Sequence, residues 1–125
     1  MNPAPAIALG VMLLIAALGA CRAQHGGPRA AQGADPRRGA ILIRAYGCGA
    51  CHRVPGIRGA EGRVAPPLDF FAERSFIAGR FPNSADNLVR WIENPPALVP
   101  ETAMPALGLF TAQARDIAAY LYTLD

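Results

Sequence analysis

Apolar side chains recur every three to four residues in three separate stretches of the chain, and this spacing predicts three amphipathic helices. The first stretch follows Asp35-Pro36, which is a helix start signal because Asp caps a helix and Pro fits its first turn. Its apolar positions are Ile41, Leu42, Ala45 and Tyr46. We therefore expect a helix that starts at residue 36 and runs towards Gly47.

The second stretch covers residues 85–93, with Ser84 or Asn83 as its cap. Asn94-Pro95-Pro96 stops this helix, because proline disfavours helical backbone in the residue before it. Its interior positions are Leu88, Val89, Trp91 and Ile92.

The third stretch covers residues 112–124 and follows Thr111, which is the expected cap. Its apolar face consists of Ile117, Tyr120, Leu121 and Leu124. We expect this face to pack on the first helix near Gly39, Ile43 and Tyr46, because glycine allows another helix to approach closely.

The connections between these helices have no regular period. Residues 53–63 are rich in Gly and Pro and are expected to form a loop. Residues 69–81 carry several apolar side chains, and we expect a short helix followed by an irregular return. No strand pattern is visible, so the predicted fold class is all-α.

The N-terminal region has a different organisation. Residues 6–20 form an uncharged apolar run, too short for a comfortable membrane span and typical of a secretory signal. Leu18-Gly19-Ala20-Cys21 resembles the lipobox of bacterial lipoproteins, which implies that Cys21 becomes the first mature residue and is acylated. An uncleaved anchor, or ordinary cleavage with an incidental Cys, remains as an alternative.

Residues 22–34 are rich in Gly, Ala and Arg and predict a flexible tether, in which His25 is a solvated side chain. We therefore divide the chain into a signal peptide (1–20), a tether (21–34) and one domain (35–125). The expected location is the periplasmic side of a bacterial membrane, with a lipid anchor.

Charge adds little to this picture. The 125 residues contain 12 Arg, no Lys and nine acidic residues, which give a net charge of +3. This bias is too weak to predict binding to nucleic acid or to an anionic membrane surface.

The candidate chemistry starts at Cys48-Gly49-Ala50-Cys51-His52, the C-x-x-C-H arrangement of a c-type haem attachment site. Each thiol adds to one haem vinyl group, and the adjacent imidazole binds the iron. A zinc site is the first alternative, but it needs four ligands, and the rest of the chain offers only Cys21 and His25. A thioredoxin-like dithiol is the second, and it requires a βαβ context that is not visible.

Two further segments fit a haem site. A metal-bound His usually donates its second ring N–H to an acceptor, and the carbonyl of Pro66 or Pro67 is our candidate. Met104 lies between Pro100 and Pro105 in a segment without a regular period, so its thioether is a candidate sixth ligand. A core role is the ordinary reading of a lone Met.

These motifs together resemble the class I cytochromes c, and the small bacterial monohaem members in particular. They come in the family's order and are Cys48–His52, Pro66-Pro67-Leu68, Trp91–Pro95, Pro100–Met104 and Ala114–Leu121. The resemblance implies an all-α cytochrome c fold of three to five helices around one covalently bound haem c, with the N- and C-terminal helices crossing. It implies thioether links at Cys48 and Cys51 and axial ligands at His52 and Met104.

The resemblance also assigns roles to neighbouring residues. Thr102 matches a family position that hydrogen-bonds near a haem propionate or a buried water. Trp91 falls where mitochondrial members carry a Tyr near the Met sulfur. Glu101 departs from the Gly that commonly follows the matching Pro, and it would put a carboxylate near the haem edge and any docking surface.

An iron with two protein ligands does not readily bind substrate, so we expect a one-electron carrier and no enzyme activity. The partners implied are a terminal oxidase, a cytochrome bc complex or a dehydrogenase, met by a monomer or by a subunit of a larger complex. The alternatives are a tethered electron-inlet subunit, and a haem enzyme or gas sensor with an open sixth site. We expect weak salt dependence of docking and an apolar contact patch formed by Ala50, Val54, Ala103, Pro105 and Leu107.

Overall fold

The computed structural model describes residues 33–125. The predicted signal peptide (1–20), Cys21, His25 and nearly all of the tether (21–34) lie outside this range, and so do their predicted roles. Within it, no helix combines the length and the apolar character needed to cross a membrane.

Helix α2 (Pro36–Ala45) starts where the sequence predicts. The Asp35 carboxylate accepts a hydrogen bond from the Arg37 backbone N–H at 2.8 Å, which satisfies one of the donors left free in the first turn. The helix ends at Ala45 with Tyr46 as its C-cap, and Gly47 follows with a φ of +69°, a left-handed conformation that glycine adopts at low cost.

Helix α3 (Ala85–Glu93) also has the predicted bounds, and Ser84 is its cap, accepting from the Asn87 N–H at 3.3 Å. Leu88, Val89 and Ile92 are buried, whereas Trp91 is half-buried against the core. Asn94-Pro95-Pro96 ends α3, as predicted, and also starts another helix. Pro95 begins a second short helix, α4 (Pro95–Leu98), which Asn94 caps by accepting from the Ala97 N–H.

Helix α5 (Thr111–Leu121) differs from the prediction at both ends. Thr111 is its first helical residue and not its cap, because the side chain of Gln113 accepts the Phe110 N–H at 3.0 Å. The helix ends at Leu121 and not at Leu124, whose carbonyl instead accepts from the Ala72 N–H at 3.0 Å.

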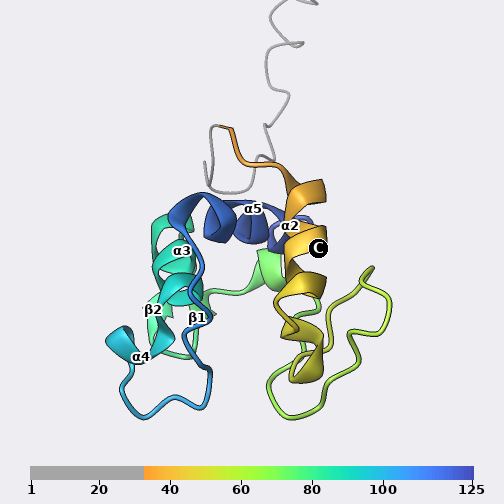
Figure 1. The fold of residues 1–125 in the computed structure, drawn as a ribbon. Coiled ribbons are helices and arrows are strands. Elements are labelled where there is room, and N and C mark those ends of the chain that lie inside the picture. Colours follow the sequence, from red (N-terminus) through yellow and green to blue (C-terminus); the bar gives the residue numbers. More distant parts are fainter. Residues whose placement is uncertain (1–32) are drawn as a thin grey trace, which may run out of the picture.

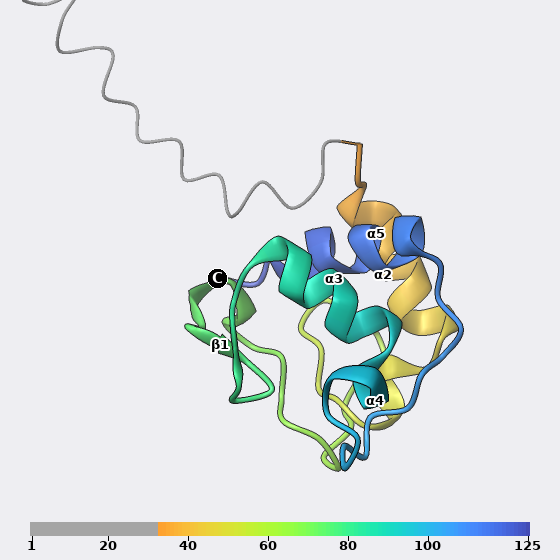
Figure 2. The same cartoon turned by 90° about the vertical axis from the view of Figure 1, so that its left-hand side faces the viewer.

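Helices α2 and α5 cross in contact, as Figures 1 and 2 show, with α3 packed on α5 from the other side. Gly39 lies at the crossing and is buried, and a Cβ built there would meet the Asp116 carbonyl oxygen at 2.0 Å. Tyr46 and Gln113 exchange a hydrogen bond further along the contact. The predicted pairing of the first and last helices is therefore confirmed.

A buried carboxylate joins the two helices at the same crossing. Asp116 is 6% exposed and accepts from the Asp35 N–H at 2.7 Å. It also accepts from Arg38 Nε at 2.8 Å and from Arg38 Nη2 at 3.0 Å. These bonds to the Arg38 guanidinium, followed by the bond to the Asp35 backbone, hold the pKa of Asp116 below its ordinary value, against the effect of burial.

The segment between the attachment motif and α3 is not purely helical. It contains one 3₁₀ turn, η2 (Phe71–Glu73), and a two-stranded antiparallel hairpin of β1 (Phe76–Ile77) and β2 (Phe81–Pro82). The expectation of no strand was wrong here, because strands of two residues are too short to show alternation. The fold as a whole remains mostly helical, as predicted.

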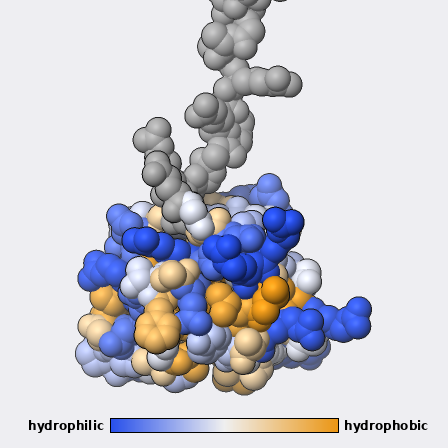
Figure 3. Space-filling model, turned by 45° about the horizontal axis from the view of Figure 1, so that its top comes forward, coloured by the Kyte–Doolittle hydropathy of each residue, from blue (hydrophilic) through white to orange (hydrophobic). Residues whose placement is uncertain are grey.

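One apolar core lies between the helices and the irregular segments. It consists of Ile43, Val54, Ile57, Ala60, Phe71, Ile77, Leu88, Val89, Ile92, Leu109, Ala114, Ile117, Ala118 and Leu121. Hydrophilic residues cover most of the face in Figure 3, and apolar residues emerge between them in small patches. The helices and the core thus hold the connecting segments, which carry the candidate site.

Candidate haem site

The attachment motif lies directly below α2, in a tight turn built on glycine. Cys48–Ala50 form the 3₁₀ helix η1, and the His52 N–H donates to the Cys48 carbonyl at 3.0 Å. A Cβ at Gly49 would meet Ala60 at 2.6 Å, so only glycine fits this turn against the following loop. The sequence thus folds both cysteines and His52 into one compact turn.

The two thiols differ in their surroundings. Cys48 is half-buried against the core, and burial raises the pKa of its thiol. Cys51 is exposed. Both are free thiols.

His52 is oriented by a backbone carbonyl. Its Nδ1 lies 2.7 Å from the Pro66 carbonyl oxygen, and because a carbonyl only accepts, Nδ1 carries the proton. Nε2 therefore keeps a lone pair that can bind a metal. This is the arrangement expected of a metal-binding His.

Of the two candidate prolines, the structure selects Pro66. The Pro67 carbonyl is not the acceptor for His52, because it accepts instead from Arg74 Nη2, and the assignment of Pro67 to the haem site stays a prediction. That guanidinium also donates to the Asp69 carbonyl at 3.0 Å and lies over the Phe71 ring.

The loop that brings Pro66 back to His52 is closed by several polar contacts. The Ala65 N–H donates to the Cys51 carbonyl at 3.0 Å, and the Leu68 N–H donates to the Arg53 carbonyl at 2.8 Å. Arg53 also pairs with Asp69 at 2.5 Å. No pattern in the sequence indicates this ion pair, because its partners are 16 positions apart on irregular backbone.

Met104 lies in the segment between α4 and α5. In Figures 1 and 2 the first part of this segment, directly after α4, lies at the same lower end of the molecule as the attachment motif, and the rest runs up to α5. Met104 is half-buried, and its backbone N–H donates to Thr102 Oγ1 at 3.2 Å. Thr102 therefore shapes the backbone next to the candidate ligand. Its predicted role near a propionate stays a prediction.

Trp91 packs against the hairpin. Its ring lies 6.4 Å from the Phe81 ring, centroid to centroid, and its side chain is half-buried. This contact supports a core role, and the position of Trp91 near the Met104 sulfur that the resemblance implies stays a prediction.

The residues of the predicted contact patch differ in exposure. Ala50, Ala103 and Pro105 are exposed, and Leu107 is half-buried against the core. Val54 is 2% exposed, so its place in the patch was wrong. The Val54 N–H donates to the Ala60 carbonyl, and this turn folds its side chain inward.

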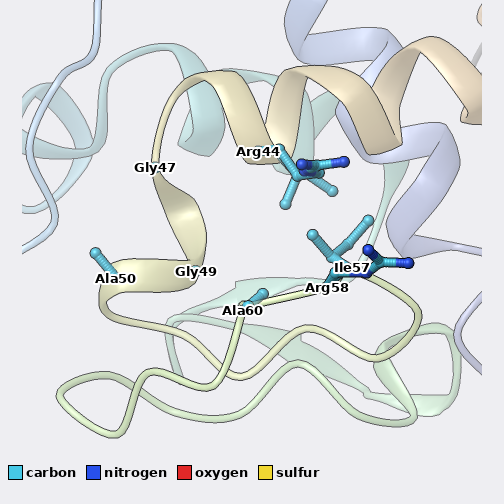
Figure 4. Close-up of a pocket in the computed structure, with 9 residues that line it drawn as sticks. Arg44, Gly47, Gly49, Ala50, Ile57, Arg58 and Ala60 are labelled. Atoms are coloured by element: carbon cyan, nitrogen blue, oxygen red, sulfur yellow. The ribbon is translucent and has the colours of Figure 1, made fainter.

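A small hollow of about 160 Å³ lies beside the attachment motif (Figure 4). Arg44 from the end of α2 lies above Ile57 and Arg58 from the following loop, and Gly49 of the attachment turn lies to one side of them. Neither His52 nor Met104 lines it. It is too small to hold a porphyrin and is separate from the candidate site.

The described residues fit a c-type haem in their donor set. They supply two thiols at the required spacing, an imidazole with a free Nε2 and a thioether on a separate segment. No group of three or more His, Cys, Asp or Glu within residues 33–125 could hold a metal ion, so the zinc alternative has no support in this part of the chain. Val64 and Phe70, which lie before and after Pro66 in the sequence, are 82% and 62% exposed and offer apolar surface to a bound group.

Comparison with known proteins gives the family of this chain. Residues 36–125 match the family model described as Cytochrome c. The chain is also similar to "Cytochrome c oxidase subunit 2" of Alkalihalophilus pseudofirmus, with 33% identity over 88 residues. These residues make up 70% of this chain and 25% of the relative, so the chain spans about a quarter of the length of that protein.

Proposed function

We propose that this chain, which belongs to the cytochrome c family, is a one-electron carrier with a single haem c. In this proposal Cys48 and Cys51 form the thioether links, and His52 and Met104 are the axial ligands. The family itself supports haem-based electron transfer. The number of haems, their attachment and the ligand pair are our proposals.

The observation that carries the proposal is the contact between His52 Nδ1 and the Pro66 carbonyl. It holds the ring in one tautomer, keeps Nε2 available and makes the imidazole a more basic ligand. A haem bound here supplies an iron that alternates between the ferric and ferrous states. The chain's part is to hold both ligands in place, so that little reorganises when an electron arrives.

Met104 decides between a carrier and a catalyst. A thioether in the sixth position keeps substrates and gases off the iron and raises the reduction potential. The Thr102–Met104 hydrogen bond supports this role because it holds the backbone on one side of Met104. We therefore propose that the chain is not an enzyme.

The test is the optical spectrum of the purified protein, oxidised and reduced, with and without carbon monoxide. We expect a weak band at the red end of the oxidised spectrum, which is characteristic of Met sulfur on ferric haem, and no change with carbon monoxide. A carbon monoxide shift in the native protein would overturn the His/Met proposal and favour an enzyme or gas sensor.

A second candidate function is the electron-inlet domain of an oxidase. The similarity to an oxidase subunit over 70% of this chain favours it. The partners in either case would be redox proteins such as a terminal oxidase, a cytochrome bc complex or a dehydrogenase. Co-purification with a membrane complex would identify a subunit, whereas isolation as a monomer would identify a free carrier.

We further propose a lipid anchor at Cys21 and a periplasmic location, on the basis of the lipobox-like sequence. Tethering would raise the effective concentration of the domain near a membrane partner. Mass spectrometry of the mature N-terminus tests this proposal, and an unmodified Cys21 would contradict it. A Cys21→Ala variant should no longer be found in the membrane fraction, and it should still contain its haem.

A further inference from the structure

The segment that carries Met104 has few polar attachments to the rest of the fold. Its own hydrogen bonds are local: the Thr102 N–H donates to the Val99 carbonyl at 3.0 Å, and the Met104 N–H donates to Thr102 Oγ1. Within residues 33–125, one ion pair ties it to a distant element. Arg80 Nη2 lies 2.5 Å from Glu101 Oε1, across 21 positions of sequence.

The β1–β2 hairpin holds the backbone of Arg80 in place. Arg80 is the last of the three residues that connect β1 to β2, and its N–H donates to the Ile77 carbonyl at 3.0 Å. Ala78 and Gly79, the two central residues of the turn that this hydrogen bond closes, both have positive φ, +51° and +66°. Ile77 is 2% exposed and anchors the hairpin in the core.

The turn itself carries strain at Ala78. Asn, Asp or Gly normally occupies this left-handed position, because a Cβ makes it unfavourable. Strained backbone persists where surrounding contacts over-determine it, and it is a reason to look for a role. Here the residue that the turn positions is Arg80.

Glu101 is a suitable partner on the other side. Its own backbone N–H and the Arg80 guanidinium lower the pKa of the carboxyl, so it is charged at neutral pH. Pro100 precedes it and restricts the backbone, and Thr102 follows it. Glu101 directly precedes Thr102, whose Oγ1 accepts from the Met104 N–H.

We infer that the Arg80–Glu101 pair is a clasp that keeps the Met104 segment closed and slows the displacement of Met104 by external ligands. The inference rests on the proposed His/Met ligation. Arg80 and Glu101 are positioning residues in this inference, acting on Met104 through the backbone. Glu101 thus serves the segment itself and is not free for a docking partner.

The experiment measures how fast added imidazole displaces Met104 from the ferric holoprotein, followed by loss of the weak red-end band. In the Arg80→Gln and Glu101→Gln variants, imidazole should displace Met104 about two- to fivefold faster than in the native protein. This is the range of effect for an exposed ion pair. The double variant should be no faster than either single variant. In the variant with the two charges exchanged, Arg80→Glu with Glu101→Arg, the rate of Met104 displacement should return towards the native rate.

Two controls separate the clasp from general effects of charge. Arg90→Gln changes an exposed arginine on α3 for which the described residues offer no ion-pair partner, and should leave the rate unchanged. High salt should accelerate displacement in the native protein but much less in the two single variants, because it screens the pair. Equal rates in the native protein and both single variants would overturn the clasp and leave the proposed function intact.

A second measurement keeps the inference testable if the proposed ligation fails. If the native protein lacks the red-end band, hydrogen exchange of the Thr102 and Met104 amides replaces the imidazole rate. Exchange about two- to fivefold faster in Arg80→Gln than in the native protein would support the clasp. Unchanged exchange would overturn it, independently of what binds the iron.

Discussion

At the scale of single residues, Pro66 has a conformational reason to orient His52. It is a proline, which restricts its φ, and it precedes Pro67, which restricts its ψ to the extended region. Its carbonyl is therefore held in one direction, 2.7 Å from His52 Nδ1. Pro67 is followed by Leu68 and lacks the second restriction, and its carbonyl accepts from Arg74.

The proposed sixth ligand gives a prediction at this scale. Met104→Ala removes the thioether, so the reduced protein should bind about one carbon monoxide per haem. Met104→His is the matched control, because an imidazole should fill the position and block the gas. Optical titration with carbon monoxide checks both, and an unreactive Met104→Ala protein would show that Met104 is not the ligand.

At the scale of elements, the crossing of α2 and α5 holds the ends of the domain together. Gly39 lets the two backbones meet, and Asp116 accepts from both the backbone and a side chain of the N-terminal region. The attachment motif begins directly after α2, so the crossing also fixes the position of Cys48.

Gly39→Ala should destabilise the protein by about 3 kcal/mol, because the new Cβ would lie 2.0 Å from the Asp116 carbonyl oxygen and the backbones would have to separate. Helix propensity alone would favour Ala by about 1 kcal/mol, so the sign of the change is diagnostic. Urea unfolding of the holoprotein measures it. A stabilised variant would mean that the helices do not approach this closely.

Asp116→Asn should lower the free energy of unfolding by about 1–3 kcal/mol at pH 7, because the buried carboxylate accepts charge-assisted hydrogen bonds. The folded pKa of Asp116 lies below its unfolded value. The contribution of the ionised Asp116 carboxylate to the free energy of unfolding is therefore complete above about pH 4, and it is lost as the pH falls through the folded pKa.

The pH dependence of urea unfolding tests this sign. The gap between the native protein and Asp116→Asn should be constant from pH 5 to 7 and narrow below about pH 4. Glu61→Gln is a control at an exposed carboxylate, and it should show no such gap. A native-to-variant difference that persists undiminished at pH 2 would contradict the assignment.

At the scale of the whole molecule, charge is nearly balanced. The chain has a net charge of +3, and Arg supplies all of its fixed positive side chains. A brief apolar contact is therefore a better model for partner docking than attraction between opposite charges. Ala103 and Pro105 next to the proposed ligand, and Ala50 in the attachment turn, are exposed and available for it.

Ala103→Asp should slow electron exchange between two copies of the protein by about tenfold, because a charge would be desolvated in the contact. Its optical spectrum should be native, since no ligand changes. Ala112→Asp, at an exposed alanine on α5, is the matched control and should exchange at the native rate. Line broadening in NMR spectra of partly reduced samples measures the rates, and equal rates would place the contact elsewhere.

The sequence by itself was sufficient for the bounds of α2 and α3, for the pairing of the first and last helices and for the family. Helix starts such as Asp35-Pro36 and Ser84 depend on local capping, and the attachment motif depends on spacing, so neither needs tertiary information. The ligand assignments also come from the sequence and stay predictions.

The tertiary structure decided what depends on residues distant along the chain. It placed the Pro66 carbonyl, and not that of Pro67, against His52, and it buried Val54 in the core. It also ended α5 at Leu121, because the Leu124 carbonyl accepts from the Ala72 N–H of η2. It also formed the two-residue strands and the Arg80–Glu101 pair. Contacts between irregular segments have no periodic signal, because they follow from how the helices bring those segments together.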